Sequence, residues 1–493
     1  MKKTLIAVVI LAIISKALGF SREVLLAYYF GTSPATDAFS LTSVIPLLIF
    51  GPLGSALAAA FIPLSTHAET KEAKLRLLAQ LGVFYLFVST LGLFVGLIYS
   101  REIATIIAPG ASGDFFTSVH FYTRISLLAF PFVGLTSILV AFQQADDKHL
   151  SANAIGIPLS LATIAIIVTA KNTDSDMLAY ATPVAYLAQA AYLLYLIAPH
   201  FHFASIKKGL WNLEVAKDAL RATSVILPTL ILIQSNGLID RVIASKLPTG
   251  SISSLAYADR IITLFIGVFI LSLSSIIFPK LSLNIREKNL LSFTANTEKA
   301  LKLTIATSIP IAVGILFFSE EIIYLVFYRG SFDQASLDVT SSCLLLYSFG
   351  IIFIGAKEII TKAFYAMNSS IQPLIAAAVA VVTNTLLSLY LSQIMGVNGI
   401  ALATSIAQAI SLIYLLIVFK MKAGSFCMTG GFKVFLWPLA ISLILAECTS
   451  ISILQSEFIS HKHLSYAVAA ALYLLTTYGL VFYLDKRKIL NLG

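Results

Sequence analysis

Apolar runs separated by short polar turns follow one another along the whole chain. A helix needs about 20 mostly apolar residues to cross a lipid bilayer, and the sequence contains fourteen segments of this kind. The runs are continuous rather than alternating, which is typical of helices and not of membrane β-strands. We therefore expect an all-α polytopic membrane protein with about 14 transmembrane helices. The segments lie at 4–30, 34–64, 77–100, 118–144, 151–170, 177–198, 219–246, 252–283, 298–319, 335–367, 370–393, 397–420, 432–454 and 464–484.

Charged residues interrupt this apolar pattern in two stretches, 19–63 and 237–279, which recur about 217 residues apart. A charge in the middle of a bilayer costs about 2.5 to 3.5 kcal/mol, so it needs an ionic partner or a watery cavity and usually marks a transport path. The charged residues of the two stretches that raise this question are Arg22, Glu23, Asp37, Asp240, Arg241, Asp259 and Arg260.

Residues that disfavour a continuous helix accompany these charges. Gly51, Pro52 and Gly54 interrupt the second segment after Pro46, and the sequence Ser-Asn-Gly at 235–237 interrupts the seventh. Such breaks free backbone groups, which are tolerated at membrane depth only against protein or water. A packing kink explains each break taken alone. Together with the charges, the breaks favour a cavity lined by both stretches.

The two stretches belong to a longer internal repeat. Residues 27–30 match 244–247 at an offset of 217, Pro63 matches Pro279 at 216, and Gly110 matches Gly330 at 220. An offset of six helices keeps both copies in one orientation, so we expect two six-helix lobes related by an axis along the membrane normal. The predicted domains are an N-terminal lobe at 1–200, an amphipathic cytoplasmic linker at 201–218, a C-terminal lobe at 219–425, and helices 13 and 14 at 426–493.

Composition and charge agree with this class. Hydrophobic residues make up 58% of the chain and charged residues 12%, and the mean hydropathy is +0.91, which excludes a water-exposed globule. The formal net charge is +9. With the N-terminus inside, most Lys and Arg fall in cytoplasmic segments, as the positive-inside rule requires. We therefore expect both termini in the cytoplasm and no nucleic-acid partner. The basic residues that fall outside are Arg101, Lys171, Lys246, Arg329 and Lys462.

Two further interpretations of the pattern change little. Residues 1–19 resemble a secretory signal peptide, whose removal would leave thirteen spans, but the polar residues 21–23 continue a helical pattern and favour a retained first helix. Paired acidic residues and histidines occur in short loops, where solvated turn residues are usual. The sequence has no P-loop, so we expect no metal, no cofactor and no ATP hydrolysis.

Several segments resemble the MurJ/MviN family of lipid-linked precursor flippases. They are SKALGFSREVLLAYYFGTSPATDAF, DRVIASKLPTGSISSLAYADRIITLFIGVFILSLSSIIFPKLS, FYRGSFDQAS, KAFYAMNSSIQP and MGVNGIALATS, and their order covers nearly the whole chain up to about residue 420. The resemblance implies the MOP exporter fold, with two lobes around a central cavity and two last helices that form a groove for a lipid tail. It also implies alternating access in the bacterial inner membrane, moving a polyprenyl-pyrophosphate-linked glycan, first of all lipid II for peptidoglycan, to the outer leaflet.

A pyrophosphate headgroup suits a cationic lining, because Arg binds oxyanions in a bidentate way. Arg22 and Arg260 are the first candidates. By resemblance, Lys16 stands where the family has an Arg, and Asp37 and Arg260 match family positions in the opposite wall. Lys357, Glu358 and Lys362 either face the cavity or form an internal ion pair beside one snorkelling lysine. The predicted substrate-binding residues are Lys16, Arg22, Asp37, Asp259, Arg260, Lys357 and Lys362, and the predicted structural ion pairs involve Glu23, Asp240 and Arg241.

One departure from the family leaves the substrate open. After Pro46 the family usually has an Asn, a pair of Arg and a Glu, whereas residues 46–55 contain none of these, and Thr263 stands where an acid is common. Another polyprenyl-linked unit, of the exopolysaccharide or O-antigen type, is therefore an alternative cargo.

A membrane glycosyltransferase is a second alternative, but it should have acidic or His clusters in a sizeable outer loop. A drug or ion antiporter should have an acidic or apolar cavity. Coupling to the membrane potential or to an ion, and cell-envelope synthases as partners, also stay open.

Overall fold

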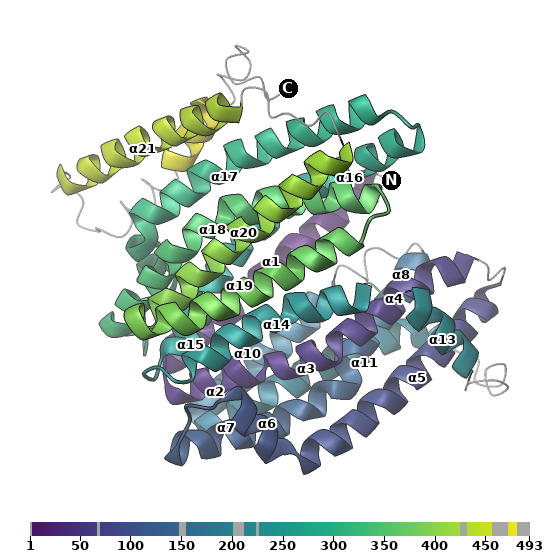
Figure 1. Cartoon of the computed structure of the whole chain (residues 1–493). Helices are drawn as coiled ribbons and strands as arrows, with labels where there is room; N and C mark the ends of the chain where they lie inside the picture. The colour runs from purple at the N-terminus through teal and green to yellow at the C-terminus, as the bar shows by residue number, and fades with distance from the viewer. Residues whose placement is uncertain are drawn as a thin grey trace. The chain divides into compact units, whose positions relative to one another are not determined.

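The computed structural model describes residues 2–66, 70–146, 154–200, 212–222, 226–423, 431–455 and 472–480. These residues form helices joined by short turns, with no strand among them (Figure 1). Each of the fourteen predicted segments contains a helix, although the last is described only over 472–480. Within the described part, nine helical stretches are long and apolar enough to cross a membrane. The prediction of an all-α polytopic membrane protein is confirmed.

The contacts between residues divide the chain into two compact units. The first contains Met1–Ser253 together with the short segment Arg329–Phe332. Short 3-10 turns at Leu127–Ala129, Ser175–Tyr180 and Ala198–His200 connect some of its helices. The helices of the first unit are α1 (Lys2–Phe30), α2 (Pro34–Thr42), α3 (Val44–Ile49), α4 (Gly51–Thr66), α5 (Lys71–Ile98), α6 (Ser100–Ile107), α7 (Gly113–Ser126), α8 (Phe130–Ala145), α10 (Gly156–Asn172), α11 (Ala181–Ile197), α13 (Leu213–Ala222) and α14 (Ile226–Ala244).

The second unit contains Ser254–Tyr328 and Asp333–Gly493. Residues 472–480 are also helical. The remaining helices are α15 (Ser251–Phe265), whose first turn belongs to the first unit, a π-helical turn (Ile266–Ile270), α16 (Leu271–Arg286), α17 (Leu290–Phe327), α18 (Gln334–Ala366), α19 (Ile371–Met395), α20 (Val397–Ala423) and α21 (Gly431–Gln455).

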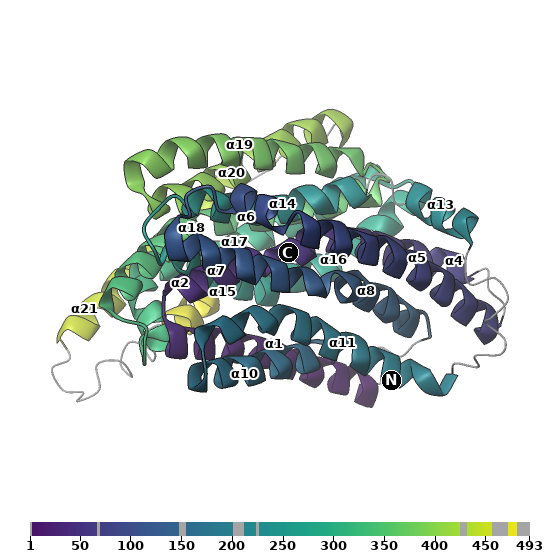
Figure 2. The same ribbon diagram turned by 90° about the horizontal axis from the view of Figure 1, so that it is seen from below.

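In the first unit, α8 packs against α4, α5 and α11, while α10 packs against α1 and α11 (Figure 2). The backbones of α4 and α8 touch, because a Cβ atom on Gly54 would lie 2.1 Å from the Cα atom of Gly134. The Tyr85 hydroxyl of α5 donates to the Phe130 carbonyl (2.7 Å) and accepts from the Gly134 N–H (2.8 Å). These bonds tie α5 to the start of α8. Small residues and one buried tyrosine therefore set the spacing of these three helices, as is typical inside membranes.

In the second unit, α17 packs against α16, α18 and α21, and α20 packs against α18 and α19. Aromatic side chains of α17, α18 and α20 meet in its core, where Phe293 and Phe364 both contact Phe419. The helical residues 472–480 pack on α17. There the Tyr473 hydroxyl donates to the Pro310 carbonyl at 3.0 Å and the Tyr478 hydroxyl to the Thr307 carbonyl at 2.9 Å. The Pro310 carbonyl is therefore satisfied from outside its own helix.

The predicted helix breaks have different outcomes. The second segment is divided near its Gly and Pro residues, since α3 ends at Ile49 and α4 begins at Gly51. The predicted break at 235–237 is wrong, because α14 runs unbroken through it and the Ser235 hydroxyl donates to the Ile231 carbonyl at 2.7 Å. One glycine in a helix costs only about 1 kcal/mol, which packing can offset. The π-helical turn between α15 and α16 carried no sequence signal.

The predicted lobes follow the sequence repeat, whereas the two units follow contacts, so the lobe boundaries stay a prediction. The helix α14, which opens the predicted second lobe, packs against α2, α3, α4 and α6 and belongs to the first unit. In the predicted linker, residues 201–211 lie outside the described residues. The helix α13 begins at Leu213 and packs on α4 and α5.

Candidate functional site

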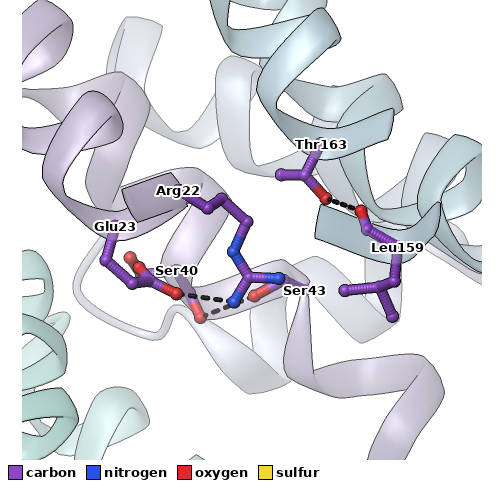
Figure 3. A network of polar contacts seen from close by, with 6 residues as sticks. All are labelled: Arg22, Glu23, Ser40, Ser43, Leu159 and Thr163. Atoms are coloured by element: carbon purple, nitrogen blue, oxygen red, sulfur yellow. Dashed lines mark hydrogen bonds and ion pairs between the residues drawn. The ribbon is translucent and has the colours of Figure 1, made fainter. Parts of the chain in front are cut away.

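The charged turn of α1 holds an ion pair. Nη2 of Arg22 lies 2.6 Å from Oε1 of Glu23, and the two side chains are 22% and 11% exposed. Neighbouring residues on a helix point about 100° apart, so the Arg22 side chain turns aside to reach its neighbour. Figure 3 shows the Arg22 guanidinium bonded to the Glu23 carboxylate. The arginine thus has the ionic partner that an apolar helix requires.

A guanidinium from another helix reaches the last turn of α2. Nη1 of Arg241, from α14, donates to the Ser40 carbonyl, which also accepts from the Ser43 hydroxyl at 3.3 Å. The carbonyl groups of the last helical turn have no partner within the helix and carry partial negative charge. The end of α2 therefore attracts a cationic group, and Arg241 approaches it from α14.

The Asp37 carboxylate is bound by the start of α15. It is 2% exposed. Its Oδ2 accepts from the Gly250 N–H at 2.6 Å, and its Oδ1 accepts from the Ser253 N–H at 2.8 Å and from the Ser253 hydroxyl at 2.7 Å. The first N–H groups of a helix lack partners within the helix, and a carboxylate satisfies them well. Asp37 thus fastens α2 to α15, and a substrate-binding role for it stays a prediction.

The other predicted residues of α1, α14 and α15 differ in exposure. Lys16 is exposed on α1, and Asp240 is buried on α14. In the second unit, Asp259 and Arg260 are exposed on α15. A role of Lys16, Asp259 and Arg260 in substrate binding stays a prediction.

Polar side chains join three helices inside the second unit. Nζ of Lys357, on α18, donates to Oε1 of Gln408 on α20. Glu358 accepts from the Ser274 hydroxyl of α16 at 3.1 Å and pairs with Lys362 at 3.2 Å. The internal ion pair considered above is therefore the one between Glu358 and Lys362. A role of Lys357 and Lys362 in substrate binding stays a prediction.

The structure adds residues that the sequence did not single out, among them Ser40, Gln408 and Ser253. Serine and glutamine are ordinary in membrane helices, so their types gave no signal. Ser253 is different, because it lies 216 residues after Asp37, which is the offset of the predicted repeat. A comparison of repeat-related positions could have found this contact.

Comparison with known proteins decides the family. The model of the family described as Lipid II flippase MurJ matches residues 26–473. The chain belongs to the MurJ family. A MurJ relative from Treponema pallidum (strain Nichols), named probable lipid II flippase MurJ, is 28% identical over 429 residues, which cover 83% of this chain and 80% of the relative.

Solved structures share the fold of this MurJ family member. A lipid II flippase MurJ in an inward closed conformation superposes with a TM-score of 0.81 at 24% identity, over 97% of this chain and 99% of that chain. An inward-facing multidrug resistance MATE family transporter of the MOP superfamily gives a TM-score of 0.70 at 15% identity, over 85% of this chain and 98% of that chain. The predicted MOP fold is confirmed.

Membership of the MurJ family also settles the class of function. The family consists of flippases, so the chain is a multi-pass membrane transporter and not an enzyme, as the sequence predicted. The membrane glycosyltransferase considered above is thereby set aside.

Proposed function

We propose that this protein is a lipid II flippase, which carries the polyprenyl-pyrophosphate-linked peptidoglycan precursor from the inner to the outer leaflet of a bacterial inner membrane by alternating access. The observation that carries the proposal is the family match over residues 26–473. The distribution of Lys and Arg supports an orientation with both termini in the cytoplasm. Membrane lipids surround the protein, and cell-envelope synthases are the partners that such a cargo implies.

The ion pair on α1 suits the headgroup of this cargo. A guanidinium has five N–H donors in a planar fork, and the bond to Glu23 uses Nη2 of Arg22. The remaining donors are of the right kind for two phosphate oxygens at once. Glu23 balances the charge of Arg22 within an apolar helix when no anion is bound.

The second unit contains a small apolar pocket near the helical residues 472–480. Apolar side chains of α15, α17 and the helical residues 472–480 line a small pocket with no polar lining, among them Phe265, Phe318 and Tyr473. Burial of a hydrocarbon chain needs no specific polar contact and gains free energy with the area removed from water. The pocket is too small to hold a polyprenyl chain, so the predicted groove for a lipid tail stays a prediction.

Loss of the Arg22 charge tests the function directly. In vesicles that contain the purified protein and fluorescent lipid II, we expect Arg22→Ala to slow flipping about ten- to hundredfold, because a charge-assisted contact contributes about 1.5 to 3 kcal/mol. Arg22→Lys should retain part of the rate. Arg76→Ala, which removes an exposed charge on α5, is the matched control and should flip normally.

The flipping assay in the same vesicles also tests the proposed function itself. Elution as a single species in detergent would show that the Arg22 variants are folded. A wild-type protein that does not flip lipid II, or an Arg22→Ala variant that flips it at the wild-type rate, would contradict the proposal at the level of function or of site.

A specific observation favours a second cargo, a polyprenyl-linked polysaccharide unit. Residues 46–55, which form most of α3 and the start of α4, contain no charged side chain, although family members usually have several there. A neutral wall suits uncharged sugars better than a charged peptide. Faster flipping of a polyprenyl-pyrophosphate oligosaccharide without peptide than of lipid II would establish this second cargo as the preferred one.

Coupling to the membrane potential or to an ion gradient is part of the proposal. A net charge that crosses a potential of 100 mV gains or loses about 2.3 kcal/mol. An imposed potential or a sodium or proton gradient across the same vesicles should therefore change the flipping rate. A flipping rate that stays the same under an imposed potential, a sodium gradient and a proton gradient would contradict coupling.

A further inference from the structure

A loop from the second half of the chain covers the end of α1. The segment Arg329–Phe332 joins α17 to α18 but belongs to the first unit. The Ser331 N–H donates to the Tyr28 carbonyl at 2.8 Å, and the Ser331 hydroxyl donates to the Tyr29 carbonyl at 3.0 Å. The approach is so close that a Cβ atom on Gly330 would lie 2.2 Å from the Tyr28 carbonyl oxygen.

A loop from the first half covers the end of α14 in the same manner. Gly110 lies between α6 and α7. A Cβ atom there would lie 2.4 Å from the Ser245 carbonyl oxygen and 2.5 Å from the Cα atom of Lys246. Both residues directly follow Ala244, the last residue of α14. A side chain at either glycine would therefore force its loop away from the helix end.

The offset of the predicted repeat relates the residues of one contact to the residues of the other. It pairs Gly110 with Gly330 at an offset of 220, and Tyr28 with Ser245 at 217. In each case, the glycine loop of one copy rests on the end of the first helix of the other copy. Such an exchange is what an interlocked pair of repeats related by a two-fold axis produces.

Two further contacts join residues that the repeat itself relates to each other. Asp37 binds Ser253, 216 residues away. A Cβ atom on Gly250 would lie 3.2 Å from the Cβ atom of Thr32, 218 residues away. Positions related by a two-fold axis meet each other only near that axis, so these residues mark the centre of the arrangement.

The contacts seal polar backbone groups. The last carbonyls of α1 have no partner within the helix, and an uncovered carbonyl is costly wherever water is scarce. While the loop is docked, Ser331 satisfies the carbonyls of Tyr28 and Tyr29. When the loop leaves, water must take over. Opening of this region is therefore tied to the entry of water.

We propose that the loops around Gly110 and Gly330 form a reciprocal latch, here called the glycine latch, which closes the predicted outer side of the protein and opens when the headgroup leaves to the outer leaflet. The statement about the headgroup rests on the proposed function, whereas the latch itself can be tested without any substrate.

A wedge at Gly330 tests the latch. Gly330→Ala is combined with a reporter, Thr36→Cys, in a chain whose Cys343, Cys427 and Cys448 are replaced by Ser. Thr36 is 0% exposed, and its hydroxyl donates to the Gly31 carbonyl at 3.1 Å, beside the latch. We expect Gly330→Ala to raise labelling of the reporter by a membrane-impermeant maleimide about tenfold, because overpacking shifts the equilibrium towards the open loop.

The chain offers a matched control for the wedge. Gly113 has a positive φ of 56°, close to the 62° of Gly330, but a Cβ atom there would meet nothing within 4 Å. Gly113→Ala therefore imposes the same backbone strain without a clash, and labelling should stay at the level of the reporter alone. Equal labelling in the two variants would overturn the latch.

A covalent lock provides the second, independent test. The distance of 3.2 Å between the Cβ positions of Thr32 and Gly250 is near the 3.5 to 4.5 Å of disulfides. In the double variant Thr32→Cys, Gly250→Cys, oxidation should abolish lipid II flipping and reduction should restore it, while Gly250→Cys alone should ignore the oxidant. Flipping by the oxidised double variant at its reduced rate would overturn the latch.

The two tests separate the latch from the function. If Gly330→Ala raises labelling while the wild-type protein flips no lipid II, the latch stands and the proposed function fails. If the wild-type protein flips lipid II but neither the wedge nor the lock has its effect, the function stands and the latch fails.

Discussion

At the scale of single residues, Asp37 is a buried and tightly bound charge of the first unit. Its two carboxylate oxygens accept three hydrogen bonds, two from backbone N–H groups at the start of α15 and one from the Ser253 hydroxyl. A buried group of this kind is costly to leave without partners. The bonds cross 213 to 216 residues of sequence, so Asp37 stabilises a long-range contact.

Asp37→Asn should weaken this contact. The amide keeps one oxygen but turns its NH2 group towards a donor, which leaves a buried N–H without an acceptor. We expect the free energy of unfolding to fall by about 1 to 3 kcal/mol, measured by thermal unfolding in detergent. Ser253→Ala removes only the hydroxyl and should cost about 0.5 to 1.5 kcal/mol. A larger loss for Ser253→Ala than for Asp37→Asn would contradict this account.

The sequence could single out some site residues and not others, for a physical reason. Arg22 and Glu23 interrupt an apolar run, and a charge there always demands an explanation. Gly250 and Ser253 demand none, because glycine and serine are common at helix starts. Their role depends on which carboxylate the fold brings to them, and that is a tertiary property.

At the scale of elements, α18 begins with a side-chain cap on the predicted outer side. Oδ1 of Asp333 accepts from the Ser336 hydroxyl at 2.6 Å and from the Ser336 N–H at 2.9 Å. These two bonds favour the charged carboxylate and lower the pKa of Asp333 below its ordinary value. The capping strength of this residue therefore depends on pH.

Asp333→Ala should lower the free energy of unfolding by about 1 kcal/mol at neutral pH, since it removes the cap. The folded-state pKa of Asp333 is depressed, so the stabilisation is fully present above the unfolded value of about 3.9 and is lost as pH falls through the folded pKa. Thermal unfolding in detergent between pH 7 and pH 3 should show the two proteins converge at the acidic end.

Asp333→Asn is the matched control, because Asn caps helices about as well as Asp but does not titrate. This variant should keep most of the stability at neutral pH. The difference in free energy of unfolding between it and wild type should not shrink specifically at acidic pH. A difference between wild type and Asp333→Ala that grows at low pH would have the wrong sign.

The elements themselves were largely predictable, because the length of an apolar run is set by the bilayer. Their internal breaks were less so. The Gly and Pro residues near 50 divide α3 from α4, whereas Ser-Asn-Gly at 235–237 leaves α14 intact. Proline removes a backbone donor wherever it stands. Glycine only lowers the intrinsic preference for a helix, and the packing of α14 against α3 and α4 offsets this loss.

At the scale of the whole molecule, the sequence predicts an orientation that the family match leaves open. The helix α5 has 28 residues, which at 1.5 Å per residue span about 42 Å and exceed the bilayer core of about 30 Å. Its two ends must therefore face opposite sides. Lys71, Lys74 and Arg76 lie near its start, while Arg101 follows its end.

Single cysteines at the two ends of α5 test this orientation, in a chain whose native cysteines are replaced by Ser. Glu72 and Arg101 are both exposed. If the N-terminus is cytoplasmic, a membrane-impermeant maleimide should label Arg101→Cys in spheroplasts and should label Glu72→Cys only after the membrane is opened. The charge bias acts on orientation because basic loops resist translocation. Labelling of Glu72→Cys alone in sealed cells would reverse the topology, and the glycine latch would then close the cytoplasmic side.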